Sequence, residues 1–536
     1  MKTSLLFKFV YSCIAIGLLN SSLQAASFSN DKVGYVPTKE NQVSREAFRN
    51  DRFGIFLHWG LYSMLAQGEW VMTNHDLNYK EYAKLASGFY PSRFDAKKWV
   101  TAIKASGAKY ICFTTRHHEG FSMFHTKWSD YNIVDSTPYG KDILKDLAEE
   151  CHKQGIALHL YYSHLDWYRT DYYPLGRTGR GTGRTMHGEW KTYYEFMNNQ
   201  LTELLTNYGP VRAIWFDGVW DHDQDPDFDW QLSEQYAMIH RLQPSCLIGN
   251  NHHQIPFEGE DIQIFERDLP GENTAGLSGQ DISHLPLETC QTMNGMWGYK
   301  IIDQDYKSAK TLIHYLVNAA GKDANLLLNI GPQPNGELPE ASVERLKEIG
   351  EWMTVFGETI YGTRAGVVSP RSWGVTTQKG NRLFVHILNL QDEGLYLPII
   401  QKVNKAFLFK NKQKVKFSQD NNGVLLKFDE VPSDIDYVVV ISNGLVSTRV
   451  RQACSLDTSA VMKALGSICG FSGGGHPKAA GCKYKELPQV QSNETPTEDV
   501  FYIMDKIISI IKDTVGYECT GMDWGKEYRK FIGDDK

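Results

Sequence analysis

A regular alternation of strand-like and helix-like segments between residues 53 and 356 constrains the fold of this chain more than any other feature. Runs rich in β-branched and aromatic residues, which favour strands, occur at 53–60, 108–115, 156–163, 214–217, 246–251, 262–266 and 325–332. Segments with the helical spacing of apolar residues occur at 95–106, 141–154, 189–208, 231–242, 305–320 and 340–356. Repeated strand–helix units predict an α/β fold with a parallel sheet, and roughly eight strands over about 300 residues suit a (β/α)8 barrel. An open doubly wound sheet is the alternative, but no Gly-x-Gly-x-x-Gly sequence opens a helix here.

Polar side chains that can transfer protons or bind hydroxyl groups stand where six of these strands end. They are His58; His117 and His118; Tyr161 and Tyr162; Trp215 and Asp217; Asn250, Asn251 and His252; and Glu266. A single histidine at a strand end is more often structural than catalytic. Packing gives no reason, however, for polar groups on six strands at one rim, and (β/α)8 enzymes carry their active sites at this rim. The sequence therefore predicts an active site there.

The strand that ends at Asp217 predicts how these side chains are oriented. Side chains alternate along a strand, so Trp215 and Asp217 share one face. The same alternation favours Tyr161 over Tyr162 for the interior of the barrel. We therefore expect an acid, an indole and a phenol to face one cavity.

A histidine-rich rim is also compatible with a metal-dependent hydrolase. Such sites generally use His-x-His after the first strand, whereas this chain has His58-Trp59-Gly60. His117 and His118 are adjacent, so on an extended strand they would point apart and could not easily share one ion. The nine cysteines include no Cys-x-x-Cys pair, which argues against zinc. We expect neither a metal nor another cofactor.

Without a metal, two carboxylates among aromatic rings and histidines are typical of glycosidic bond cleavage. One carboxylate stays ionised as the nucleophile, and the other has a raised pKa and protonates the leaving oxygen. Asp217, beside Trp215, is the candidate for the ionised group. Glu266 and Glu288 are both candidates for the acid.

Several longer motifs surround these candidate residues. They include Phe53-Gly54-Ile55-Phe56-Leu57-His58-Trp59-Gly60, Gly68-Glu69-Trp70, Leu160-Tyr161-Tyr162-Ser163, Trp215-Phe216-Asp217-Gly218, and Glu288-Thr289-Cys290 with Trp297-Gly298-Tyr299. The most specific are Arg116-His117-His118-Glu119-Gly120-Phe121 and Leu327-Leu328-Asn329-Ile330-Gly331-Pro332. Over about residues 53–441, the chain resembles the α-L-fucosidases of glycoside hydrolase family 29.

This resemblance implies a (β/α)8-like barrel followed by a β-sandwich, no metal, and retention of configuration through a fucosyl–enzyme ester. It implies Asp217 as the nucleophile. The acid/base is the least fixed position of this family; we expect Glu266, with Glu288 as the second choice because its motif is implied to support the shape of the site. The implied sugar-binding residues are His58, Glu69, Trp70, His117, His118, Tyr161 and Trp215. We expect His252, from the strand end, and Trp297 to bind substrate as well. Many members carry an arginine after the fifth strand, where this chain has Asn250-Asn251-His252-His253.

The N-terminal sequence and the net charge bear on location and partners. Lys2 and Lys8 precede an apolar run at 9–19, which predicts a secretory signal peptide over residues 1–26 and export to the periplasm or the exterior. The alternative is an uncleaved anchor; no later run is long and apolar enough to span a membrane. The net charge of −7 gives no electrostatic reason to expect nucleic acid as a partner. The expected partner is a fucosylated glycan.

Two further regions follow the predicted barrel domain at 27–364. Short strand-like runs at 383–390, 406–409, 424–428 and 437–441 predict a small antiparallel β-sandwich over 365–444. The tail at 445–536 combines helical patterns at 457–465 and 497–513 with a glycine-rich motif at 473–481, and from about 447 onward it resembles the accessory domain of DHH-type phosphoesterases. No DHH catalytic domain precedes it, which favours a fused or misassigned segment over a second active site.

The sequence therefore predicts a retaining exo-α-L-fucosidase that hydrolyses terminal α-L-fucose from glycans or glycoconjugates by double displacement. Two alternatives stay open: a fucose-binding protein without turnover, and a phosphodiester-binding role for the tail. The presence of both candidate carboxylates favours the enzyme.

Overall fold

A computed structural model describes residues 34–185, 188–443, 472–474 and 481–483. The predicted signal peptide at 1–26 and the predicted tail helices at 457–465 and 497–513 lie outside these residues. In the tail, the short antiparallel strands β17 (Ser472–Gly474) and β18 (Gly481–Lys483) take up the two ends of the glycine-rich motif. Among the described helices, none has the length and apolar character needed to cross a membrane.

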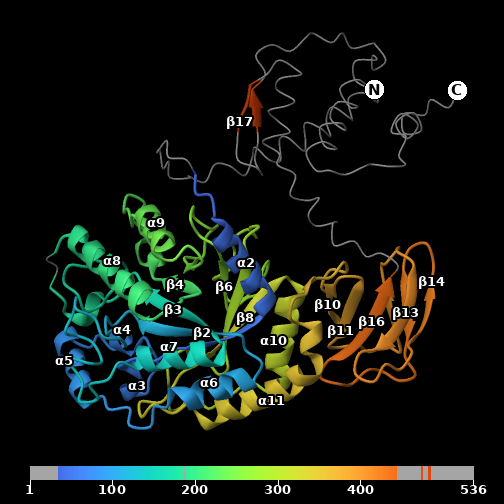
Figure 1. Cartoon of the computed structure of the whole chain (residues 1–536), viewed down its shortest axis with the longest axis horizontal. Coiled ribbons are helices and arrows are strands. Elements are labelled where there is room, and N and C mark those ends of the chain that lie inside the picture. Colours follow the sequence, from blue (N-terminus) through green and yellow to red (C-terminus); the bar gives the residue numbers. More distant parts are fainter. Residues whose placement is uncertain (1–33, 186–187, 444–471, 475–480, 484–536) are drawn as a thin grey trace. The chain divides into compact units, whose positions relative to one another are not determined.

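Eight parallel strands form a nearly closed barrel, in the order β5-β4-β3-β2-β1-β8-β7-β6 (Figure 1). A parallel bridge between Gly249 and Ile262 brings the two ends of the sheet together. The strands are β1 (Phe53–Leu57), β2 (Tyr110–Arg116), β3 (Ala157–Ser163), β4 (Ala213–Asp217), β5 (Leu247–Asn251), β6 (Gln263–Glu266), β7 (Leu287–Thr292) and β8 (Ala324–Ile330). The predicted (β/α)8-like barrel is confirmed. Strand β7 is not among the strands predicted from the sequence, because its polar residues mask the strand pattern.

Helices cover the barrel on only part of its circumference. The long ones are α2 (Lys39–Asp51), α6 (Ala96–Ala105), α7 (Ile143–Gln154), α8 (Trp190–Asn207), α9 (Leu232–Leu242), α10 (Ala309–Gly321) and α11 (Glu340–Phe356). The short helices α3 (Tyr62–Leu65), α4 (Val71–Asn74) and α5 (Tyr79–Ala83) follow β1. Across the fully described stretch from β5 to β7 there is no helix. The connections after β5 and β6 are therefore irregular loops, and both contribute to the site described below.

Two antiparallel sheets follow the barrel and confirm the predicted sandwich. The larger has the order β13-β16-β11-β10-β9 and the smaller β12-β15-β14. Their bounds are β9 (Arg364–Ala365), β10 (Gly374–Lys379), β11 (Arg382–Ile387), β12 (Gly394–Leu397), β13 (Val403–Leu408), β14 (Lys416–Gln419), β15 (Val424–Lys427) and β16 (Tyr437–Asn443). Leu383, Val385 and Ile387 of β11 point into the apolar core between the sheets.

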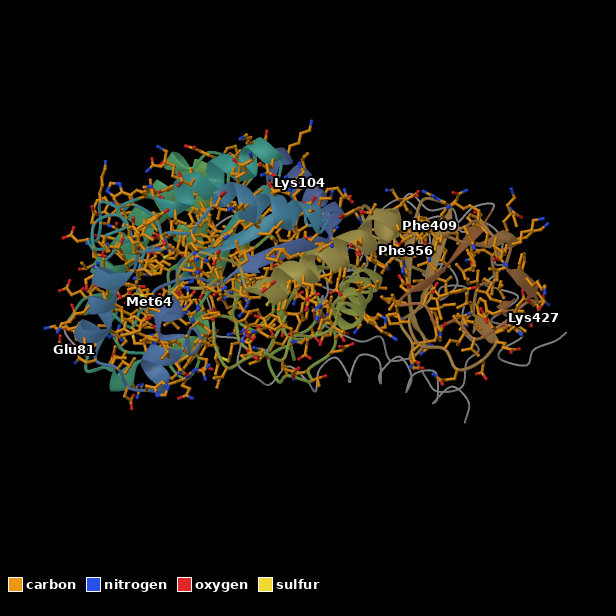
Figure 2. The ribbon with its side chains drawn as sticks, turned by 90° about the horizontal axis from the view of Figure 1, so that it is seen from below. Met64, Glu81, Lys104, Phe356, Phe409 and Lys427 are labelled. Carbon is orange, nitrogen blue, oxygen red and sulfur yellow. The ribbon has the colours of Figure 1, made fainter. Side chains whose placement is uncertain are left out.

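The other face of the larger sheet packs on the barrel helices. Because side chains alternate along a strand, Phe384, Val438 and Val440 point away from the sandwich core and join the hydrophobic core of the barrel. Figure 1 places α10 between the barrel strands and this sheet, and Figure 2 shows Phe356, at the end of α11, close to Phe409. The centroids of these two rings are 5.9 Å apart. Barrel and sandwich therefore share one continuous core.

Replacing Phe409 with alanine tests this shared core. Its side chain is 7% exposed and packs on Phe356 and Phe384, so Phe409→Ala should lower the free energy of unfolding by about 3–5 kcal/mol, as is typical for a buried phenylalanine. We expect one thermal transition, shifted to lower temperature, in both circular dichroism and tryptophan fluorescence. Ile400→Ala, at a side chain that is 70% exposed, is the control and should change little. Two separate transitions, of which only one moves, would contradict a shared core.

Candidate active site

A cavity of about 210 Å³ lies at the C-terminal ends of the barrel strands. It is smaller than the roughly 300–1,000 Å³ of pockets for drug-sized ligands, so it suits one small ring. Nine predicted site residues line it: His58, Glu69, Trp70, His117, His118, Trp215, Asp217, Glu266 and Trp297. The barrel therefore brings together residues that are spread over more than 230 positions of the sequence.

Three other predicted residues do not line this cavity. Tyr161 lies beneath it and donates a hydrogen bond of 3.0 Å to Asp217 Oδ2. Glu288 is fully buried and accepts hydrogen bonds from the Tyr110 hydroxyl (2.6 Å) and from Trp215 Nε1 (2.9 Å). His252 faces Glu260, with its Nε2 3.0 Å from Oε1, and does not line the cavity.

The turn after β5 explains the different position of His252. The strand ends at Asn251, and the chain enters the left-handed region at His253, where φ is 61°. His253 rather than His252 consequently lines the cavity. Sequence analysis also missed Trp220 as a cavity residue, although a tryptophan three positions after the predicted nucleophile was visible in the sequence.

His117 and His118 both line the cavity, contrary to the expectation that they would point apart. The physical reason is that β2 ends at Arg116, so the two histidines follow the strand and do not alternate. Their ring centroids are 4.1 Å apart. No group of three histidine, cysteine, aspartate or glutamate side chains in the described part of the chain has an arrangement that could hold a metal ion.

Hydrogen bonds determine which nitrogen of two cavity histidines carries the proton. His58 Nδ1 lies 2.6 Å from Asn329 Oδ1. The Asn329 amide is oriented by its Nδ2, which donates to the Trp297 carbonyl, so Oδ1 is an acceptor. His118 Nδ1 lies 2.7 Å from the Ser163 hydroxyl, which itself donates to the Leu165 carbonyl. Each Nδ1 must therefore be the donor. Burial lowers the pKa of His58 to about 3 and that of His118 well below its ordinary value, so both rings are neutral and their Nε2 atoms can accept hydrogen bonds from hydroxyl groups.

Asp217 is held at the end of β4 by uncharged donors. Its Oδ1 accepts hydrogen bonds from the Gly218 backbone N–H and from Trp220 Nε1, both at 2.8 Å. Gly218 has φ of 97°, and a Cβ there would lie 2.9 Å from the Leu165 nitrogen, so glycine is required for this close approach. Oδ2 accepts the Tyr161 hydroxyl and lies 3.5 Å from His118 Nε2, which carries no proton, so Oδ2 is the less hydrogen-bonded oxygen.

The Asn251 amide joins Asp217 to Glu266. Its Nδ2 lies 2.8 Å from Glu266 Oε2 and 3.5 Å from Asp217 Oδ1. His253 Nε2 lies 3.1 Å from the same Glu266 oxygen. The two carboxylates therefore face one cavity from neighbouring strands, with one amide between them.

Burial, and next the charge of Glu266, raises the pKa of Asp217 to about 6. Burial acts on Glu266 in the same direction, but the contacts with His253 and Asn251 outweigh it and hold the pKa of Glu266 below its ordinary value. The sequence pattern predicted the opposite order of these two pKa values, with the acid/base above the nucleophile, because nothing in it indicated that His253 lies beside Glu266. Since like charges repel at this distance, one proton on the pair is favoured below about pH 6.

Three comparisons with known proteins agree. Residues 22–358 match the family described as Alpha-L-fucosidase. Plasma alpha-L-fucosidase of Rattus norvegicus is 30% identical over 402 residues, which cover 67% of this chain and 81% of that protein. The structure of alpha-L-fucosidase isoenzyme 1 from Paenibacillus thiaminolyticus has 32% identity and a TM-score of 0.67, covering 76% of this chain and 100% of that one. A further match is the structure of a GH29 alpha-L-fucosidase from Bacteroides thetaiotaomicron, solved as a trapped covalent intermediate with 2-fluoro-fucosyl fluoride. It has 25% identity and a TM-score of 0.67, covering 78% of this chain and 99% of that one.

The environment of Glu288 generates a prediction about stability. Burial raises the pKa of Glu288 to about 7, well above an ordinary glutamate, so its ionised form destabilises the folded protein. The destabilisation is absent below about pH 4, grows as the pH rises through 7, and reaches on the order of 3 kcal/mol. Glu288→Gln should therefore match the wild type in thermal stability near pH 4 and exceed it at pH 8.

The matched control is Glu344→Gln, at a side chain that is 66% exposed, which should change stability little at either pH. If Glu288→Gln destabilised the protein equally at both pH values, the buried-charge interpretation would be wrong.

Proposed function

The chain belongs to the alpha-L-fucosidase family, and from that premise we propose that Asp217 and Glu266 carry out its retaining hydrolysis of α-L-fucosides, as nucleophile and acid/base respectively. The observation that carries this assignment is the Asn251 amide, which contacts both carboxylates at the cavity. Glu288, the alternative acid, is turned away from the cavity toward Tyr110 and Trp215.

In the first step, Asp217 Oδ2 attacks the anomeric carbon of fucose while the bond from that carbon to the leaving oxygen breaks. The Glu266 proton passes to the leaving oxygen, so the aglycone departs as a neutral alcohol. The product is a fucosyl ester on Asp217. Because Oδ2 accepts a single hydrogen bond, it is the oxygen more available to attack.

In the second step, Glu266 acts as a base. Its carboxylate removes a proton from a water molecule, whose oxygen attacks the anomeric carbon as the ester bond to Asp217 breaks. Two inversions give fucose with its original configuration. Asp217 and Glu266 are restored to their starting protonation states.

The distance between the carboxylates supports retention. Because both oxygens contact the same Asn251 nitrogen, at 3.5 and 2.8 Å, their separation cannot exceed the sum of these lengths. Such close facing oxygens suit a retaining enzyme, whose carboxyl groups lie about 5–5.5 Å apart, better than an inverting one, which must admit a water molecule between the two groups. The covalent intermediate of the Bacteroides thetaiotaomicron relative agrees with this proposal.

The remaining cavity residues suit a small sugar. His58 and His118 offer bare Nε2 acceptors to hydroxyl donors, and Glu69 offers a carboxylate that already accepts the Gly298 N–H at 2.7 Å. Trp215 and Trp297 supply apolar faces for the C–H side of a fucose ring. We propose that these groups bind the fucose, that no metal takes part, and that residues 1–26 direct the enzyme to export.

Rescue by azide tests the two roles separately. Asp217→Gly and Glu266→Ala should each lower kcat by several orders of magnitude on an aryl α-L-fucoside. Azide should rescue both, but from opposite sides of the sugar. The Glu266→Ala enzyme should yield α-fucosyl azide, because azide replaces water on the covalent intermediate, whereas Asp217→Gly should yield β-fucosyl azide by direct displacement.

Identification of both azides by NMR decides the assignment. Rescue of Glu288→Ala in place of Glu266→Ala would make Glu288 the acid/base. No measurable hydrolysis of aryl α-L-fucosides by the wild type would contradict the proposed function itself.

The proton shared by the pair predicts an acidic pH optimum. Catalysis requires one proton on the pair. The free enzyme holds it mainly on Asp217, and it must stand on Glu266 in the reacting complex; the pair loses it as the pH rises through the pKa of Asp217 at about 6. The kcat/KM of the wild type should therefore fall about tenfold per pH unit above that value. In Glu266→Gln, hydrolysis of α-L-fucosyl fluoride needs no acid and only an ionised Asp217, so its kcat/KM should instead rise with pH. A wild-type profile that stays flat from pH 5 to pH 8 would contradict this account.

A further inference from the structure

At the exposed side of the cavity, we infer an anion-binding subsite formed by Arg177, which recognises a sulfate or carboxylate group on the leaving part of the substrate. The inference rests on the proposed function, because an exo-acting enzyme encloses the fucose and leaves the rest of the glycan at the exposed side. Arg177 lines the cavity, and its side chain is 43% exposed. It belongs to the loop between β3 and α8 (Figure 1).

The Arg177 guanidinium is anchored through one end only. Its Nε donates to the Trp220 carbonyl at 3.1 Å, and its central carbon lies 5.0 Å from the centroid of the Trp220 ring. Within residues 34–185 and 188–443, neither Nη atom has a hydrogen-bond partner. A guanidinium with two parallel N–H groups free is suited to bind the paired oxygens of a carboxylate or sulfate.

The backbone of this loop is also fixed in place. The Arg177 N–H donates to the Asp221 carbonyl at 2.9 Å, and the Asp221 carboxylate accepts the Thr178 N–H (2.8 Å) and the Tyr172 hydroxyl (2.8 Å). At Gly176 a Cβ would lie 1.9 Å from Asp221 Oδ2, so only glycine allows the loop backbone to pack this closely on the carboxylate. Little ordering is therefore required when an anion binds, which favours affinity.

The binding surface is next to the reaction centre. Trp220, which supports the guanidinium, also donates its indole N–H to Asp217 Oδ1 at 2.8 Å. Arg177 thus stands one side chain away from the nucleophile. The neighbouring charge that competes for it is Asp223, whose Oδ1 lies 3.7 Å from Arg177 Nε and whose side chain is 41% exposed. Asp223 faces Nε and leaves the Nη atoms available.

Three matched substrates test the subsite: an aryl α-L-fucoside with a carboxylate on a short methylene chain, the methyl ester of the same compound, and an analogue with a sulfate ester. The remote substituent leaves the acidity of the phenol nearly unchanged, so the chemistry is matched. We expect the anionic substrates to have a KM on the order of tenfold lower than the ester at low salt, with similar kcat, because the contact is made equally before and during reaction. The difference should shrink as ionic strength rises.

Variants of three charged residues identify the subsite. Arg177→Gln should abolish the preference, so that the anionic substrates and the ester have similar KM values in this variant. Lys191→Gln removes the same charge from the start of α8, at a side chain that is 81% exposed and outside the cavity lining, and should keep the preference. Asp223→Asn should increase it, because the competing carboxylate is gone.

The outcomes separate this inference from the proposed function. Turnover of the neutral ester tests the fucosidase activity alone. Equal KM values for all three substrates in the wild type, or a preference that persists in Arg177→Gln, would overturn the subsite. A preference for only one of the two anions would support it and identify the group that it binds.

Discussion

The buried carboxylate of Asp217 is the constraint on which the rest of the site depends. A charge at this depth is destabilising unless hydrogen-bond donors surround it, and the barrel supplies them from three neighbouring strands. The parallel register sets Asp217 beside Ser163 of β3 and Asn251 of β5, and Tyr161 beside Trp215. Donors and acceptors are therefore positioned by strand pairing itself, and a slip of one residue in register would reverse the faces of these side chains.

The two carboxylates lie in regions of different regularity. Asp217 ends a central strand that is paired on both sides, whereas Glu266 ends the four-residue strand β6, in the part of the barrel without covering helices. His253 contacts Glu266, and Arg267 follows Glu266 in the sequence. Both residues have φ of 61°. Strained backbone of this kind concentrates at functional sites, where surrounding contacts maintain it. The nucleophile is thus on the regular side of the rim and the proposed acid/base on the irregular side.

This difference also explains how much the sequence could predict. Side-chain alternation and strand ends are sufficient to place Trp215 and Asp217 at the cavity and to turn Tyr161 toward Asp217, because those positions follow from a regular strand. They fail where a strand stops: alternation places His117 and His118 on opposite sides and the strand end indicates His252, whereas the turns after β2 and β5 bring His117, His118 and His253 to the cavity. Strand β7 was missed for a related reason, since both of its faces carry polar side chains. The packing of the sandwich on α10 and α11 depends on tertiary contacts that no local pattern encodes.

The nature of the donors around Asp217 has a chemical consequence. An amide, an indole, a phenol and a backbone N–H are all uncharged, so they stabilise the carboxylate without the large lowering of pKa that a lysine or arginine would cause. A carboxylate that keeps a high pKa also keeps its basicity, and with it the ability to form a bond to carbon. Arg177, the cationic side chain of this cavity, contacts the Trp220 ring and carbonyl. Trp220 therefore separates its charge from the nucleophile, and the charge is available to the leaving part of the substrate. The site thus keeps neutral donors at the reacting carbon and places positive charge at the exposed side.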